Sequence, residues 1–403
     1  GTIRGGGFGG IPTHRGVSYR SGMDRQYGST TAAVLTRLPE LVLPLTGWYV
    51  HDVEQKIAAI GTVTLDSEEA IQAARAAYDA LSDQRKAQVS NYDVLLAAEA
   101  RLAELNAQDI YKTTGDFIVS KGAPVTGSIG GEWAVLGLAR SGRDVPGADA
   151  YYASVVEYVQ KAMDENGRLN RSRSTENSRL ILALTAIGKD VTHVAGRSLL
   201  DGLDSMAFIT KQSVNGPVWA LLALDSGKYE IPENPDAAVQ ATRQMYVDEL
   251  LTRELPDGGW TLTGGEPDVD ITAMTLQALA KYHDQADVAA AVERGLAVLS
   301  SLQEPDGGYV SWGSSNSESV AQVIVALTEL GVPLDDERFV KNGVTVEDAL
   351  LRFAQESGAF VHVLDGSGGD DGMATEQAFY ALASIHRAET GETTLYDMTD
   401  VMQ

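Results

Sequence analysis

Four carboxylates stand at matching positions in a series of buried helices that the sequence predicts. Each of these helices carries an Ala-Leu pair or a near variant, and alignment on that pair places Asp270 and Glu318 eight residues before it. Glu132 and Glu376 stand five residues before the pair, in the first and last helices. Equal positions on parallel helices lie at equal depth, so we expect these side chains to form an acidic mouth at one end of the assembly. Two facing carboxylates can act as acid and base in glycoside cleavage.

Further acidic residues fall near the predicted helix starts, namely Asp268, Glu176, Asp370 and Asp371. A carboxylate at a helix N-terminus accepts hydrogen bonds from free backbone N–H groups and stabilises the helix dipole, so capping alone accounts for these four. Glu132 and Glu376 lie one turn deeper, where a buried carboxylate needs a partner or takes a raised pKa. For these two residues a structural hydrogen bond and a ligand site both stay open.

Aromatic side chains supply a second set of candidates. Trp133, Trp219 and Tyr380 lie on the predicted buried helices, and they could form a stacking wall together with Trp260 and Trp312. Packing in the core or against a turn is the commoner role of such residues. The candidate ligand-binding set is therefore Asp268, Asp270, Glu318, Glu132, Glu376, Trp133, Trp219 and Tyr380.

The elements that must position these residues repeat along the chain from Asp109 onward. Helices with apolar residues on nearly every side alternate with amphipathic helices. The buried helices are expected around Trp133–Gly142, Leu180–Gly188, Trp219–Gly227, Ala273–Ala280, Ala321–Gly331 and Ala374–Ile385. The amphipathic helices are expected around Ile110–Ser120, Tyr151–Met163, Arg197–Thr210, Thr242–Leu255, Ala289–Leu302 and Val346–Gln355. Residues 109–403 are thus predicted to form an all-α toroid of six inner and six outer helices, an α6/α6 toroid.

The first 108 residues differ from the repeats in composition and in the pattern of their apolar residues. Residues 1–50 are rich in glycine and slightly basic, which is typical of an extended arm, with one short helix possible over Thr31–Val42. Residues 51–108 are predicted to form a small three-helix spacer. Its helices are expected over Val53–Ile60, Ser67–Leu81 and Tyr92–Leu105.

Composition excludes several classes of function. A formal net charge of −25 would repel a phosphate backbone, so nucleic acid is not an expected partner. The chain has no cysteine, which rules out disulfides, thiol nucleophiles and Cys-ligated zinc. The six histidines show no paired ligand spacing, so no metal and no resident cofactor are expected. No membrane-spanning run and no signal peptide are visible, and insertion into a membrane is not expected.

Two turns point to a family of toroids. Pro256-Asp-Gly-Gly-Trp260 and Pro305-Asp-Gly-Gly-Tyr309 are almost identical, and Gln303 precedes the second. This pattern resembles the QW repeats of squalene–hopene cyclases, which occur across the terpene cyclase and protein prenyltransferase toroids. The resemblance implies a structural role, in which the aromatic ring stacks over the end of an outer helix.

The segment Asp268-Val-Asp-Ile-Thr-Ala-Met274 resembles the Asp-x-Asp-Asp-Thr-Ala motif of class II terpene cyclases. The resemblance implies that Asp270 matches the aspartic acid that protonates an alkene or an epoxide in those enzymes. An acid used in this way needs a partner that makes its proton labile. The third aspartate of the motif is replaced here by Ile271.

A third resemblance covers the spacer and the toroid. The segment 127–142, together with the altered acid motif, is similar to non-cyclase prenyltransferase-like repeat proteins of Gram-positive bacterial surfaces, which are related in fold to transcobalamin and intrinsic factor. Residues 80–92 resemble helical spacers of surface proteins from the same bacteria. This implies an extracellular or cell-surface location. A cobamide-type ligand would need a partner β-domain, so it is not part of the prediction.

The leading functional hypothesis is a non-catalytic, secreted or surface-attached module whose acidic mouth binds a small molecule, a glycan or a protein. Two enzymatic alternatives stay open. The first is a glycan hydrolase or lyase that uses Asp270 with Glu318, or Glu132 with Glu376, as its carboxylate pair. The second is an enzyme like a class II terpene cyclase, working through Asp270.

Overall fold

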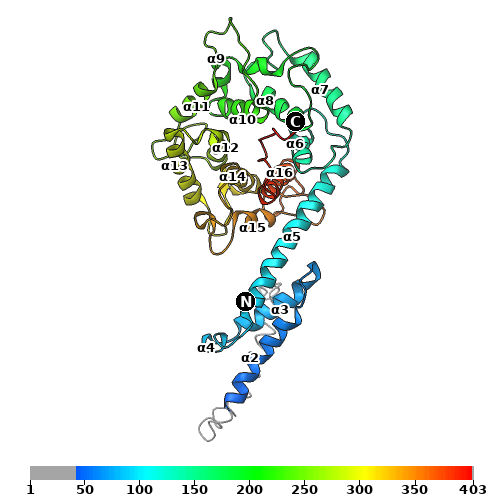
Figure 1. Cartoon of the computed structure of the whole chain (residues 1–403), viewed down its shortest axis with the longest axis vertical. Coiled ribbons are helices and arrows are strands. Elements are labelled where there is room, and N and C mark those ends of the chain that lie inside the picture. The colour runs from blue at the N-terminus through cyan, green and yellow to red at the C-terminus, as the bar shows by residue number, and fades with distance from the viewer. Residues whose placement is uncertain (1–41, 402–403) are drawn as a thin grey trace, which may run out of the picture. The chain divides into compact units, whose positions relative to one another are not determined.

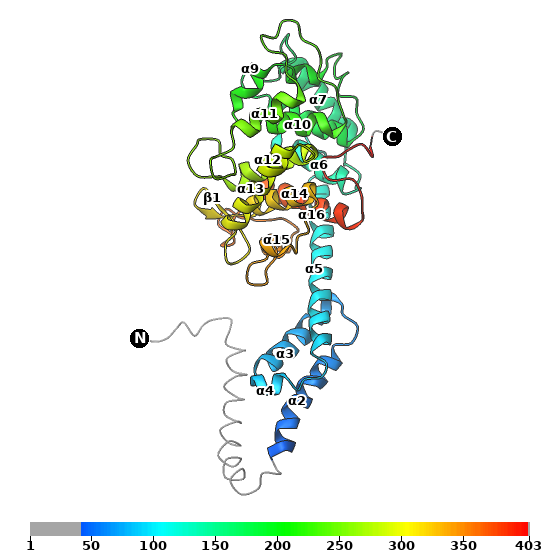
Figure 2. The same cartoon turned by 60° about the vertical axis from the view of Figure 1, so that its left-hand side comes forward.

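The computed structural model of the chain describes residues 42–401. The chain divides into two compact units, with the boundary between Asp109 and Ile110. The smaller unit contains α2 (Val42–Ala59), a 3-10 turn (Leu65–Ser67), α3 (Glu68–Asp79), α4 (Asp83–Lys86) and the first part of α5 (Tyr92–Ser120) (Figures 1 and 2). Its core is built from one face of each longer helix, with Ile57, Ile71, Ala74 and Leu95 all buried.

The helices of the smaller unit differ from the prediction at three places, one of which is the short helix α4, which was not expected. α2 begins at Val42, well before the expected Val53. The short helix expected over Thr31–Val42 lies outside the described residues except for Val42 itself. The helices expected over Tyr92–Leu105 and Ile110–Ser120 are one helix, α5, because no glycine or proline interrupts the residues between them. The boundary between the two units falls within this helix.

Six parallel helices form a closed inner ring in the larger unit. They are α6 (Trp133–Arg140), α8 (Thr175–Ala186), α10 (Asn215–Ser226), α12 (Val269–Leu279), α14 (Ser317–Leu330) and α16 (Gly372–Glu389). Each packs on the next, and α16 packs on α6 (Figure 1). The inner helices are buried on almost every side: in α14, every residue from Ser317 to Thr328 is buried except Glu318. The predicted all-α toroid is confirmed.

The outer layer surrounds this ring (Figure 1). Its regular helices are the end of α5, α7 (Ala148–Ala162), α11 (Arg243–Thr252), α13 (Ala286–Leu302) and α15 (Val346–Leu351). Short 3-10 turns cover Thr210–Gln212, Ala280–Tyr282 and Glu337–Phe339, and a small hairpin pairs β1 (Val310–Ser311) with β2 (Ser314–Ser315).

The third outer helix, expected over Arg197–Thr210, is broken into a 3-10 turn (Leu199–Leu203) and α9 (Met206–Ile209). Two contacts favour the break. A side chain at Gly202 would collide with the amide of Asn177, so this glycine lets the backbone approach α8 closely. The carbonyl of Asp204 accepts a hydrogen bond from the N–H of Ala241, which a continuous helix would not allow.

The seam between α6 and α16 closes the ring at three depths. Near the starts of the helices, the Gly130 N–H donates to Oε1 of Glu376 at 2.7 Å. In the middle, the ring of Phe379 packs against Gly137, where any larger side chain would collide with it. Near the ends of the helices, Arg387 donates to the carbonyl oxygen of Arg140 at 3.0 Å.

The two Gly-rich turns have the structural role that the sequence predicted. Trp260 and Tyr309 are completely buried. The indole N–H of Trp260 donates to the carbonyl of Leu250, and the hydroxyl of Tyr309 donates to the carbonyl of Leu299. Each ring therefore donates to a carbonyl in the last turns of an outer helix, where intrahelical partners become fewer.

The segment after α16 plugs the ring at the end where the inner helices finish. Leu395, Tyr396 and Met398 are buried there. The guanidinium of Arg140, also buried, donates to the carbonyl oxygens of Leu395, Thr394 and Asp397 and pairs with Asp400. With the hydroxyl of Thr393, this one buried cation holds five acceptors of the plug, and nothing in the repeat pattern indicated this arrangement.

We expect Arg140→Met to lower the free energy of unfolding of the larger unit by about 3–5 kcal/mol, because it leaves buried carbonyls without their donor and removes one of the two guanidinium groups that pair with Asp400. Urea denaturation followed by tryptophan fluorescence measures this change. Lys161→Met is the matched control, since Lys161 makes only an exposed ion pair one helical turn from Glu157. Equal loss in the two variants would contradict the assigned role of Arg140.

Candidate functional site

The starts of the inner helices define one end of the ring, which we call the mouth. Asp268 and Asp371 cap two of these helices there: their side chains accept hydrogen bonds from the N–H groups of Ile271 and Ala374, both at 2.9 Å. Asn316 caps α14 in the same way, through the N–H of Ser319. Capping therefore fixes the backbone of α12, α14 and α16 at the point where the acidic side chains project.

Asp270 lies in the first turn of α12, close to the hairpin and the start of α14. The hydroxyl of Ser311 lies 3.5 Å from its Oδ2, and the hydroxyls of Ser311 and Ser319 lie 2.9 Å apart. The amide of Asn316 donates to Ser311 at 3.0 Å, which fixes the orientation of this pair. Oδ1 of Asp270 is buried and has no hydrogen-bond partner among the described residues.

This setting raises the pKa of Asp270 to about 6. Burial is the main cause, because it disfavours the charged form, and the negative charges of Asp268 and Glu318 act in the same direction. Hydrogen bonds from Ser319 and Ser311 to the carboxylate act in the opposite direction and limit the rise of the pKa. A carboxyl group with a pKa near 6 holds its proton in mildly acidic solution and can give it up close to neutral pH.

A pocket of about 320 Å³ opens beside Asp270. Its wall is formed by the loop between α11 and α12, by Ile271 and by Trp312. Trp312 is 86% exposed and stands in the turn of the hairpin with a positive φ of 50°, an uncommon backbone conformation for a bulky residue. The lining combines apolar side chains with three carboxylates, and it includes no lysine or arginine: Thr261, Leu262, Thr263, Gly264, Glu266, Pro267, Asp268, Asp270, Ile271 and Trp312.

Glu318 belongs to the same part of the mouth. It is near enough to Asp270 to raise its pKa, and its Oε2 lies 2.7 Å from Nδ1 of His362. The hydroxyl of Ser317 donates to the same oxygen at 3.2 Å. The structure therefore brings Asp270 and Glu318 together, as the register of the inner helices predicted, and adds a histidine from the loop before α16.

Glu132 and Glu376 are brought together by the closed seam, but their surroundings differ. Glu132 is 1% exposed, and its carboxylate accepts from the N–H of Gly127, from Nε of Arg179 at 2.9 Å and from the hydroxyl of Tyr151. With all these donors it is fully engaged in holding the turn before α6. This is the arrangement of a structural carboxylate.

Only one of the two carboxylate oxygens of Glu376 has a hydrogen-bond partner among the described residues. Glu376 is 6% exposed; its Oε1 accepts from Gly130, while its Oε2 is buried without a partner among the described residues. Burial and the nearby negative charge of Glu132 raise the pKa of Glu376 to about 7, against the effect of the Gly130 hydrogen bond. Glu132 forms an ion pair with Arg179. Glu132 and Glu376 therefore do not offer the two free, facing carboxylates that glycan cleavage needs.

The candidate aromatic residues form a cluster inside the ring. The ring centroids of Trp133 and Trp219 lie 5.3 Å apart, and those of Trp133 and Tyr380 lie 6.0 Å apart. Tyr396 of the plug packs edge-on against Trp219. These residues contact one another, whereas the aromatic residue in the pocket beside Asp270 is Trp312.

Sequence reasoning missed Ser311, Ser319 and Asn316 as neighbours of Asp270, and it missed His362 beside Glu318. The pattern Asn316-Ser-Glu-Ser319 is a capping sequence, and that was the signal available for two of them. The described residues contain no cluster of three or more His, Asp or Glu side chains that could hold a metal ion. Within the same residues, no helix is both long and apolar enough to span a bilayer.

The chain is similar to known proteins over part of its length. No family model matches it. A drimenyl diphosphate synthase of Streptomyces showdoensis is 30% identical over 178 residues, which cover 43% of this chain. The chain spans about 30% of the length of that curated relative. A crystal structure of a protein from Actinoplanes aligns with 70% of this chain and 99% of its own, at 13% identity and a TM-score of 0.43.

These findings correct the leading functional hypothesis. The curated relative is an enzyme of the terpene cyclase type, and its similarity together with the helical ring fits a terpenoid cyclase-like fold. The prediction of a non-catalytic binding module is therefore wrong. The hypothesis gave weight to the replacement of the third aspartate by Ile271, but the pKa of Asp270 also depends on burial and on two neighbouring carboxylates, which raise it to about 6.

The raised pKa of Asp270 makes a prediction for stability. An unfolded aspartic acid ionises near pH 4, whereas folded Asp270 keeps its proton up to about pH 6. Between these values the folded state binds more protons at this residue, so the contribution of Asp270 to the stability of the wild type falls as the pH rises from 4 to 6. Asp270→Asn removes this penalty, and we expect the variant to gain roughly 2–3 kcal/mol over the wild type between pH 4 and pH 7.

Urea denaturation of both proteins at pH 4, 5, 6 and 7 measures this gain. Asp284→Asn, at an exposed position in the loop before α13, controls for the general loss of one negative charge. A difference between wild type and Asp270→Asn that stays constant over this pH range would show that the pKa of Asp270 is not raised.

Proposed function

We propose that this protein is an enzyme of the class II terpene cyclase type, in which Asp270 protonates a carbon–carbon double bond of an isoprenoid chain. The observation that carries the proposal is the state of Asp270 at the wall of a pocket: the residue is half-buried, its pKa is raised, and its Oδ1 is buried without a hydrogen-bond partner among the described residues. The similarity to a drimenyl diphosphate synthase supports the same class of chemistry.

In the proposed reaction, the carboxylic acid of Asp270 transfers its proton to one carbon of the double bond, which leaves a carbocation on the other carbon. A second double bond of the same chain attacks that carbocation and closes a ring. Loss of a proton to water then restores a neutral hydrocarbon skeleton, and Asp270 regains its proton from solvent. The product is an isomer of the substrate, so no oxidant, reductant or co-reactant is required.

The surroundings of Asp270 suit this role. The charges of Asp268 and Glu318 raise its pKa and keep the acid protonated, while the hydroxyls of Ser311 and Ser319 stabilise the carboxylate that remains after transfer. In the motif of class II cyclases a third aspartate stands next to the acid. Here we propose that the two hydroxyls replace it, because Ile271 at that position has no polar group.

The pocket lining indicates how the chain would be placed. Leu262 and Ile271 offer apolar contact, and the exposed face of Trp312 can stabilise a carbocation through its π electrons. The lining contains no basic residue, so a diphosphate group, if the substrate carries one, would point out of the pocket and away from Asp270. The hydrocarbon end of the substrate would then face the acid.

Several predictions about context rest on the sequence alone. The extracellular location and the relation to Gram-positive surface proteins and to cobalamin carriers stay predictions from the sequence resemblance. The same holds for the expectations of no resident cofactor and no nucleic-acid partner.

We expect Asp270→Asn to abolish cyclisation, with turnover reduced by at least about a thousandfold, because the amide cannot donate a proton of comparable acidity. The assay incubates the purified protein with geranyl, farnesyl and geranylgeranyl diphosphate and identifies cyclic products by mass spectrometry. Asp284→Asn is the control and should keep wild-type turnover. Cyclic product from the Asp270→Asn variant at the wild-type rate would contradict the proposal.

The pH dependence of the rate provides a second test. Because only protonated Asp270 is active and its pKa is about 6, kcat/KM should fall about tenfold for each pH unit above 6 and level off below it. Glu318→Gln removes a negative charge that raises this pKa, so its falling limb should move to lower pH. A pH profile that is identical in wild type and Glu318→Gln would show that Asp270 is not the titrating acid.

A further inference from the structure

A group of basic residues lies at the mouth beside the starts of α8 and α10. The connection that leads into α8 carries Arg168, Arg171 and Arg173, and the 3-10 turn before α10 carries Lys211. We call these four residues the basic sector. Its position is unexpected from composition, because the chain has 56 acidic residues against 31 basic ones.

Contacts between the two connections join the members of the basic sector. The Nζ of Lys211 donates to the carbonyl oxygen of Arg171 at 3.1 Å. The guanidinium of Arg168 lies 4.3 Å from the ring centroid of Phe208, and the Nζ of Lys211 lies 5.9 Å from the same centroid. Cations from the two connections therefore share one aromatic ring, which is itself 1% exposed.

Hydrogen bonds fix the backbone from which these cations extend. The Oδ1 of Asn170 accepts from the N–H groups of Ser172 and Arg173 at 3.0 and 3.1 Å. The side chain of Gln212 bridges to Thr175, with its Oε1 accepting from the Thr175 N–H and its Nε2 donating to the Thr175 hydroxyl, both at 3.0 Å. Lys211 and Arg173 flank this bridge, so their backbones are held in place before any ligand binds.

The cations of the basic sector lack close carboxylate partners. Arg173 lies 3.8 Å from Glu176, but Glu176 already pairs with Arg179 at 2.7 Å. The other three form no ion pair with a carboxylate among the described residues. Several positive charges close together favour a bound anion, and exposed arginines such as Arg171 offer the forked donors that suit a phosphate group.

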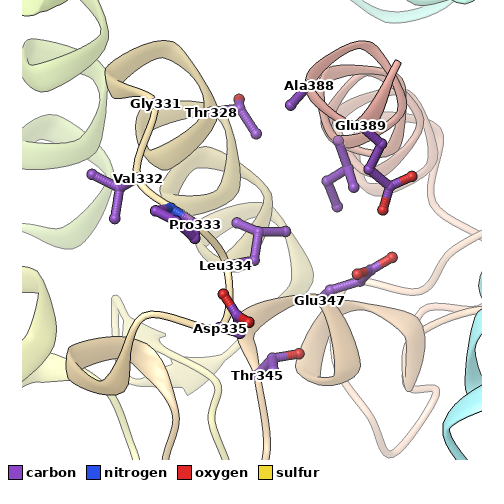
Figure 3. A pocket seen from close by; sticks show the side chains of 11 residues that line it. Thr328, Gly331, Val332, Pro333, Leu334, Asp335, Thr345, Glu347, Ala388 and Glu389 are labelled. Atoms are coloured by element: carbon purple, nitrogen blue, oxygen red, sulfur yellow. The ribbon is translucent and has the colours of Figure 1, made fainter. Parts of the chain in front are cut away.

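The pockets described at the two ends of the ring offer no comparable charge. The pocket beside Asp270 has no lysine or arginine in its lining. The pocket at the end where the inner helices finish is lined by Asp335, Glu347 and Glu389, and it also lacks lysine and arginine (Figure 3). An anionic head group therefore fits neither pocket, whereas the basic sector provides positive charge at the same mouth as Asp270.

The order of the inner helices relates the basic sector to the acid. α8 packs on α10, and α10 packs on α12, which carries Asp270 in its first turn. Packed helices lie about 8–10 Å apart, so one to two helix spacings, roughly 10–20 Å, separate the basic sector from Asp270. A substrate that reaches both needs a hydrocarbon chain of several isoprene units.

We propose that the basic sector binds the diphosphate head of a linear isoprenoid diphosphate whose far double bond lies beside Asp270. Because that double bond meets the acid of the proposed cyclase, the assignment of the head group rests on that proposed function. The head group is bound and not transferred: its C–O bond stays intact while the proton adds at the far end. The cyclic product therefore keeps its diphosphate.

Isothermal titration calorimetry of the full chain with inorganic diphosphate measures this site without turnover. We expect Arg171→Gln and Lys211→Gln each to weaken binding about tenfold, because each removes a charged donor to the anion. Lys228→Gln, at an exposed position in the loop after α10 and at the other end of the ring, makes the same change in charge and should bind like the wild type. Asp270→Asn should also bind like the wild type. Equal affinity in all these proteins would overturn the proposal.

Steady-state kinetics with farnesyl diphosphate connects the site to turnover. In Arg171→Gln and Lys211→Gln we expect KM to rise about tenfold with a smaller change in kcat, because the head group binds in the ground state and in the transition state alike. Inorganic diphosphate should inhibit the wild type competitively and these two variants more weakly. An unchanged KM in both variants would contradict the assignment. If no protein forms a cyclic product while both variants alone lose diphosphate binding, the proposed cyclase function is wrong and the anion site stands.

Discussion

Closure of the inner ring is the constraint on which the rest of the larger unit depends. The inner helices are apolar on nearly every side, so each needs two inner neighbours, and the first helix can obtain its second neighbour only from the last. Gly137 makes this possible, because the absence of a side chain lets the ring of Phe379 pack directly against α6. The contact between Glu376 and Gly130 then fixes the mouth, and the contact between Arg387 and Arg140 fixes the plugged end.

The same ring gives similar carboxylates opposite roles. Glu132 is surrounded by donors, including the guanidinium of Arg179, and holds the turn before α6 in place. Asp270 stands at the same end of the ring, but its partners are two hydroxyls and its nearby charges are negative. Burial raises the pKa of both residues, but at Glu132 the guanidinium of Arg179 and the hydrogen bonds from Gly127 and Tyr151 counteract this rise, whereas the charges near Asp270 add to it.

Much of the fold could be predicted because the inner and outer helices differ in the pattern of their apolar residues. The register of the inner helices also placed Asp270 beside Glu318 correctly, since depth along a parallel helix follows from counting residues. Contacts made by loops could not be predicted in this way. Ser311 comes from a hairpin and His362 from an irregular loop, and neither has a periodic position.

Other differences arose where a tertiary contact outweighs a local pattern. The outer helix predicted over Arg197–Thr210 is broken because Gly202 packs on Asn177, a contact with no local signal. The function was misjudged for a related reason. The motif was compared by residue identity at Ile271, whereas the pKa of Asp270 is set by burial, by the charges of Asp268 and Glu318 and by hydrogen bonds from two serines.

The position of the seam along the chain also determines the order in which this unit can fold. Gly130 and Glu376 are separated by 246 residues, and Phe379 is synthesised long after Gly137. During translation, one apolar face of α6 therefore stays uncovered while the next four inner helices, α8 to α14, are synthesised and pack one on another. Such distant contacts slow folding and leave apolar surface exposed to aggregation in the meantime. The inner ring thus stays open until α16 is synthesised. The packing of α16 against both α14 and α6 then closes it.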